Sequence, residues 1–149
     1  MVGEDFVIED IPLDGYQIVR GQYFSRVSDA WLTLWETTCQ FNVSAYEMLN
    51  NCEAVQIMVN LKSRSIVVKP VSSSEDNAIV WLRNPDNPRT SKLECSPFTR
   101  RLYSAWGWNP ALRYRTHGRL VKSRNNLMLL FDFHNPEVWD GMRKVKEDG

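Results

Sequence analysis

The sequence has few cysteines, no long apolar run and no net charge. Its three cysteines are an odd number without a C-x-x-C pair, which argues against a disulfide framework and fits a reducing compartment. No run of eighteen apolar residues occurs, so we expect no membrane span. Residues 1–12 are acidic and lack the apolar core of a secretion signal, so we expect a cytoplasmic protein.

The sequence also lacks the motifs of common catalytic sites. It contains two histidines, His117 and His134, and neither has a Cys, Asp or Glu at metal-ligand spacing. No glycine-rich phosphate loop and no G-x-S-x-G motif occur. We therefore expect no metal, no cofactor and no enzymatic activity. A weaker alternative is a reactive thiol, because Cys39 and Cys95 each precede a predicted helix start. Packing as small apolar side chains is the simpler expectation for both.

The sequence is rich in large aromatic side chains, and its charges are distributed unevenly. Aromatics make up 11% of the chain and include six tryptophans, which is untypical of a disordered segment. We expect most of these tryptophans in the core, and an exposed one would indicate a protein interface. Residues 1–75 hold five basic and ten acidic side chains, whereas residues 76–149 hold thirteen and eight. The basic half can attract phosphate or an acidic protein surface.

The first half of the chain predicts a strand, a short helix and a β-hairpin. Residues 30–35 form a short apolar run typical of a buried strand. Ser44 and Glu47 have the S-x-x-E spacing of a capping box, which predicts a helix start at Ser44. Residues 55–60 are β-branched and alternate in polarity, and residues 65–70 provide the return strand after a turn.

The second half repeats this order of elements. Residues 78–82 read as a strand, Ser96 as a helix cap before Pro97, and Gly107 as the residue that ends the helix. Phe98, Leu102 and Ala105 have the spacing of an apolar helical stripe. Residues 112–121 and 127–133 then predict two long strands joined by a polar turn. An extra strand is expected at residues 17–24, and residues 1–12 and 140–149 are expected to fray.

This repetition predicts one α+β domain over residues 1–149. The two units cover about residues 30–71 and 78–133, and their predicted cap serines lie 52 positions apart. Identity between the units is low, so the match is one of element order. Because a unit of this size can hardly bury its own core, we expect the two units to share a mostly antiparallel sheet.

Basic side chains gather in the second unit and predict a binding surface. Side chains alternate along a strand, so Arg113, Arg115, His117 and Arg119 are expected on one face. Such a row can bind phosphates, grip acidic protein side chains, or simply be solvated and protect the sheet against aggregation. The predicted phosphate contacts are Arg100, Arg101, Arg113, Arg115, Arg119, Lys122 and Arg124.

Several strings of residues resemble a known family of small proteins. They are Arg20–Arg26 (RGQYFSR), Phe41-Asn42, residues 55–60, Lys69-Pro70, Gly107–Pro110 (GWNP), and Arg113-Tyr114-Arg115 with Gly118. Together they resemble, over about residues 17–139, small proteins from phages and integrative elements of Firmicutes that are often labelled integrase. The Arg…His-x-x-Arg…Tyr arrangement of tyrosine recombinases is absent, so we expect no recombination.

The repeated unit also looks similar to the tandem units of swapped-hairpin bacterial regulators, which bind DNA through basic residues. Such regulators dimerise, so the likeness implies either a homodimer or two units that satisfy this pairing within one chain. Together, these observations predict a non-enzymatic nucleic-acid-binding regulator or accessory protein of a mobile element. The alternative is an anti-defence protein, such as an anti-CRISPR, that inhibits a host defence system by binding one of its proteins.

Overall fold

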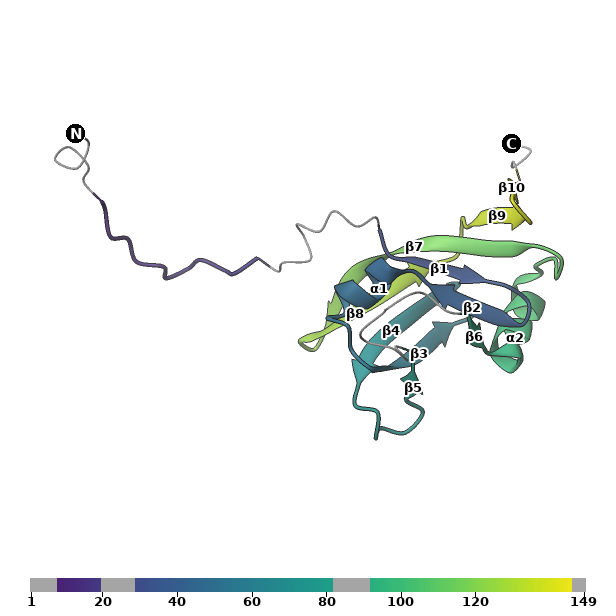
Figure 1. Cartoon of the computed structure of the whole chain (residues 1–149), viewed down its shortest axis with the longest axis horizontal. Coiled ribbons are helices and arrows are strands. Elements are labelled where there is room, and N and C mark those ends of the chain that lie inside the picture. The colour runs from purple at the N-terminus through teal and green to yellow at the C-terminus, as the bar shows by residue number, and fades with distance from the viewer. Residues whose placement is uncertain (1–7, 20–28, 82–91, 146–149) are drawn as a thin grey trace.

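The computed structural model describes residues 8–19, 29–81 and 92–145 (Figure 1). Within these ranges the chain forms ten strands and two short helices. The strands are β1 (Trp31–Leu34), β2 (Thr38–Phe41), β3 (Ala54–Asn60), β4 (Ser65–Val71), β5 (Ile79–Val80), β6 (Leu93–Glu94), β7 (Arg113–Ser123), β8 (Asn126–Asp132), β9 (Glu137–Asp140) and β10 (Arg143–Lys144). The helices are α1 (Val43–Met48) and α2 (Ser96–Trp106).

All strands join one curled sheet in which every pairing is antiparallel (Figure 1). Eight of them follow the order β5-β3-β4-β8-β7-β1-β2-β6. Strand β9 pairs with the first residues of β7, on the edge where β8 pairs further along the strand, and β10 pairs with β9. The predicted α+β class with a mostly antiparallel sheet is therefore confirmed. In the described ranges, no helix is long and apolar enough to cross a membrane.

The core lies on the inner face of the sheet and draws on both halves of the chain. Phe41 contacts Trp81 and Phe131 edge to face, with ring centroids 5.0 and 5.8 Å apart. The prediction that most tryptophans are buried is wrong. Only Trp81 and Trp106 are buried, and the other four remain partly exposed. Two of these four lie on the outer face described below.

Helix α1 begins earlier than the capping box predicted. The side chain of Asn42, not Ser44, accepts the backbone N–H of Ala45 at 3.1 Å. Asn42 also accepts the N–H of Trp31 at 2.9 Å and donates to the carbonyl of Asp29 at 2.8 Å. These bonds connect the start of the helix to β1. Asn42 is therefore the N-cap because of its tertiary contacts as well as its position. Ser44 is instead buried, and its hydroxyl has no hydrogen-bond partner among the described residues.

Helix α2 confirms the predicted end but not the predicted cap. Gly107 follows the last helical residue with φ +65°, a left-handed conformation that glycine adopts readily. Cys95, not Ser96, is the N-cap and makes no side-chain cap bond. The predicted apolar stripe is wrong at Ala105, which is exposed. The buried side of the helix consists of Thr99, Leu102, Tyr103 and Trp106.

The predictions for the two ends of the chain were only partly right. Residues 17–19 form no strand, and the rest of the segment predicted as residues 17–24 lies outside the described residues. At the other end, β9 and β10 were not predicted, and the expected fraying over 140–149 is wrong for Arg143 and Lys144. Strand β9 pairs with Arg113–Arg115 of β7, and this pairing places it beside the predicted basic row.

Candidate nucleic-acid interface

The outer face of β7 carries the predicted row of basic side chains. Tyr114, Thr116 and Gly118 are buried, whereas the residues between them are partly or fully exposed. This alternation agrees with the period of two expected for a half-buried strand. The side chains that share the outer face of β7 are Arg113, Arg115, His117 and Arg119.

Two partly exposed indoles interleave with this row. Trp31 of β1 lies opposite His117, and its ring centroid is 3.9 Å from the guanidinium carbon of Arg115. Trp139 of β9 lies opposite Arg113, whose guanidinium carbon is 5.2 Å from the ring centroid. These contacts are in the range of cation–π interactions and hold the arginines close to aromatic surface. The sequence prediction missed both indoles.

Carboxylates partly neutralise the predicted set. Glu137 of β9 lies opposite Arg115, with Oε1 3.6 Å from the guanidinium Nε, and its Oε2 is 3.8 Å from the ammonium of Lys144. On α2, the Nε of Arg100 is 3.4 Å from Oε1 of Glu36. Arg100 and Arg115 therefore already interact with carboxylates of the same chain.

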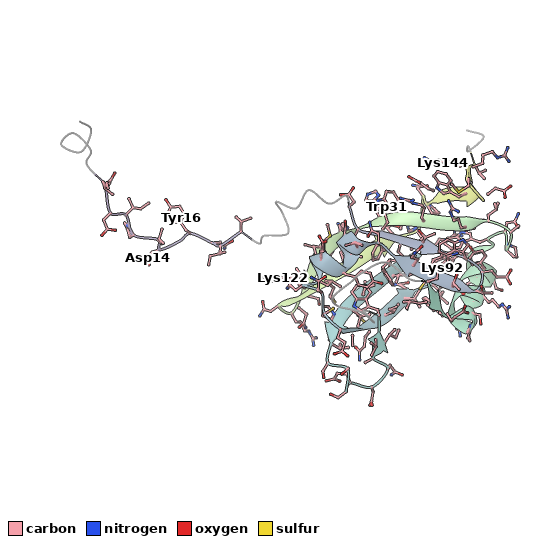
Figure 2. All side chains as sticks on the ribbon, in the orientation of Figure 1. Asp14, Tyr16, Trp31, Lys92, Lys122 and Lys144 are labelled. Atoms are coloured by element: carbon pink, nitrogen blue, oxygen red, sulfur yellow. The ribbon has the colours of Figure 1, made fainter. Side chains whose placement is uncertain are left out.

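The remaining predicted contacts do not form one patch. Arg101 is exposed on α2 rather than on the sheet. Lys122 lies at the far end of β7 (Figure 2), and by alternation its side chain belongs to the opposite face from Arg119. Arg124 lies in the hairpin turn with φ +50°. The first and last residues of an eleven-residue strand are about 33 Å apart. The predicted phosphate contacts are therefore spread along the length of the molecule.

A polar cavity lies beside the outer face of β7. Its volume is about 330 Å³, and His117, Arg119, Asp132, His134 and Asn135 contribute to its lining. The chain's two histidines thus meet at one cavity although they are far apart in the sequence. The cavity was not predicted, and its only sequence signal is the Asp-x-His spacing at the end of a strand.

Asp132 and His134 form a close pair in this cavity. The Nδ1 of His134 is 2.7 Å from Oδ1 of Asp132, and the backbone N–H of His134 donates to the same oxygen at 3.0 Å. The backbone bond, the imidazole and the charge of Arg119 hold the pKa of the Asp132 carboxyl below its usual range. With Nδ1 facing a carboxylate, the ring is oriented and Nε2 is the nitrogen left for other partners.

Replacing Asp132 with asparagine is expected to remove an acid-dependent part of the stability. A lowered folded-state pKa stabilises the fold above the unfolded-state pKa, and this contribution is lost as the pH falls through the folded-state pKa. Because the pair is exposed, we expect Asp132→Asn to cost less than about 1 kcal/mol at neutral pH. Urea denaturation of both proteins at neutral pH and below about pH 3 measures this. A cost that persists unchanged at the lower pH would contradict the prediction.

Comparison with known proteins gives no relative. The chain matches no protein-family model, no curated protein and no solved structure. In the part of the chain that is described, no three His, Cys, Asp or Glu side chains group closely enough to hold a metal ion.

Proposed function

We propose that the chain is a non-enzymatic nucleic-acid-binding protein that serves a phage or mobile element as a regulator or accessory factor. The observation that carries the proposal is the outer face of β7, where a row of basic side chains lies beside partly exposed indoles on the neighbouring strands β1 and β9. Guanidinium groups bind phosphates, and indoles stack on bases of any sequence. A surface that combines both is typical of contact with single-stranded nucleic acid.

We assign each side chain of this face a role in nucleic-acid binding from the contacts that it makes. Arg113 and Arg119 form no ion pair with another described residue at 4.0 Å or less, so they are proposed as the main phosphate contacts. Arg115 is held by Glu137 and Trp31, and it is proposed to orient that indole rather than to bind phosphate. Trp31 and Trp139 are proposed as the stacking surfaces.

The polar cavity supports a phosphate position beside Arg119. Because Nδ1 of His134 faces Asp132, Nε2 is the ring nitrogen that can face a bound phosphate. Arg119 and His117 line the same cavity and supply further donors. A phosphate group there would meet donors from β7 and from the end of β8, and Asp132 would offset part of their charge.

The proposal includes the duplication of the strand–helix–hairpin unit. Exchanging β1 to β4 with β5 to β8 reverses the order β5-β3-β4-β8-β7-β1 and so preserves each of its pairings, whereas the β1–β2 pairing has no β5–β6 counterpart among the described residues. The pairings β4–β8 and β2–β6 are their own counterparts under the same exchange. This order supports the likeness to swapped-hairpin DNA-binding regulators, with both units supplied by one chain.

The test is the salt dependence of binding to labelled single-stranded and duplex DNA, measured by fluorescence anisotropy. Neutralised phosphates release counterions, so affinity should fall linearly on a log–log plot. We expect Arg119→Gln to reduce the magnitude of the slope by about 0.7 for single strands or about 0.9 for duplex, the value of one phosphate contact.

Lys92→Gln is the matched control, because it also removes one exposed positive charge. Lys92 precedes β6, which is three strands away from β7 in the sheet, and its ammonium lies 4.2 Å from the ring centroid of Trp35. We expect an unchanged slope. The proposal would be overturned if the chain bound neither single-stranded nor duplex DNA at low salt. It would also be overturned if the chain bound no DNA but captured one host protein in stoichiometric amount.

A further inference from the structure

Two of the three cysteines meet across the β2–β6 pair, away from the outer face of β7. Cys39 lies opposite Leu93, and Cys95 donates its backbone N–H to the carbonyl of Thr37 at 3.1 Å. Cys39 and Cys95 are therefore diagonal neighbours across the pair. Both are free thiols, and each one influences the ionisation of the other. Neither the sequence prediction nor the proposed function uses this contact.

The two sulfur atoms are not equivalent. The neighbouring Cys95 side chain and burial raise the pKa of the Cys39 thiol. The Cys39 side chain, with a contribution from Thr99, lowers the pKa of Cys95. Cys95 is also the N-cap of the eleven-residue helix α2, where the helix dipole favours an anion. Cys95 is thus the sulfur that more readily carries a negative charge.

Both cysteines line a cavity of about 620 Å³. It lies where the two ends of the eight-strand path approach each other, because β5 and β6 both contribute to its wall. Ile57, Ile79 and Phe98 make much of this wall apolar, and Glu94 adds one carboxylate. The volume is that of a small-molecule site, and the carboxylate disfavours an anionic ligand.

We propose that Cys95 and Cys39 form a thiol–disulfide exchange pair for a small disulfide that carries no negative charge. The Cys95 thiolate attacks one sulfur of the disulfide, which forms a mixed disulfide and expels one thiolate. Cys39 gives its proton to the expelled thiolate and attacks the sulfur of Cys95, which releases the second half as a thiolate that takes a proton from water. Two protein thiols are oxidised to one disulfide, and the small disulfide is reduced to two thiols.

The test treats the reduced full-length chain with 2-hydroxyethyl disulfide and follows intact mass and peptide maps after acid quenching. We expect a transient adduct on Cys95, followed by a product that has lost two hydrogens and links Cys39 to Cys95. The Cys39→Ser variant should stop at the adduct. The Cys95→Ser variant should react about tenfold more slowly, because the more reactive thiolate is gone.

Cys52→Ser is the matched control, since it removes the third cysteine. Burial raises the pKa of the Cys52 thiol, and Cys52 does not line the cavity, so its loss should leave the rate within about twofold. Circular dichroism checks that each variant is folded, and Cys95→Ala replaces Cys95→Ser if the serine variant unfolds. Modification mainly at Cys52, an unchanged rate without Cys95, or a stable adduct on Cys95 in the unaltered chain would overturn the proposal.

Discussion

Replacing Trp81 with alanine is expected to lower the free energy of unfolding by about 3–5 kcal/mol, the usual cost of removing a large buried aromatic side chain. Trp81 is 1% exposed. Its ring centroid lies 5.0 Å from that of Phe41 and 4.5 Å from that of Tyr46. Its Nε1 donates to the carbonyl of Cys52 at 2.8 Å. The variant therefore leaves a cavity among aromatic rings and an acceptor without its donor.

Two further variants separate these contributions, with urea denaturation followed by circular dichroism as the measurement. Trp81→Phe keeps an aromatic ring but removes the donor to the partly buried carbonyl of Cys52, and this loss should cost about 1 kcal/mol. Trp139→Ala is the matched control on the outer face, where the loss of a partly exposed indole and its cation–π contact should cost about 1 kcal/mol. Equal losses for Trp81→Ala and Trp139→Ala would contradict the assignment of Trp81 to the core.

Local patterns were sufficient where a few neighbouring residues determine the structure. The β-branched alternation over residues 55–60 and the return over 65–70 predicted β3 and β4 closely, and Gly107 ends α2 as predicted. Local patterns failed where residues distant in the sequence determine the structure. Asn42 caps α1 because it also bonds to Trp31 and Asp29. Strand β9 exists because β7 supplies its hydrogen-bonding partners, and residues 137–140 alone give little sign of a strand.

Some features of the candidate site could likewise be predicted from local sequence, and others could not. Alternation along one strand correctly predicted that Arg113, Arg115 and Arg119 share a face. The indoles beside them could not be predicted, because the register of β7 with β1 and β9 joins residues about 25 to 85 positions apart. The cavity depends on the same register, since it combines β7 with the end of β8. The charges of Lys122 and Arg124 place them in the predicted set, but the hairpin carries both residues away from the face.

Replacing Gly118 with alanine is expected to destabilise the fold by about 1–3 kcal/mol, because an added methyl group overpacks the core. A Cβ atom at this position would lie 2.7 Å from the ring carbon Cε1 of Phe131. Phe131 lies directly opposite Gly118 in the β7–β8 pair and is fully buried. Its ring also contacts Phe41, and the close packing of the core opposes its displacement.

A double-mutant cycle with Phe131→Leu tests this cause, with urea denaturation as the measurement. The smaller side chain at residue 131 makes room for the new methyl group. The cost of Gly118→Ala in the Phe131→Leu background should therefore fall by about 0.5–3 kcal/mol, the range of coupling between residues in contact. Additive costs would show that another mechanism destabilises Gly118→Ala.

Because Gly118 lies between His117 and Arg119, a strand displaced by the methyl group would also shift the outer face. If the proposed function holds, Gly118→Ala should thus weaken DNA binding in the Phe131 background and regain affinity when residue 131 is leucine.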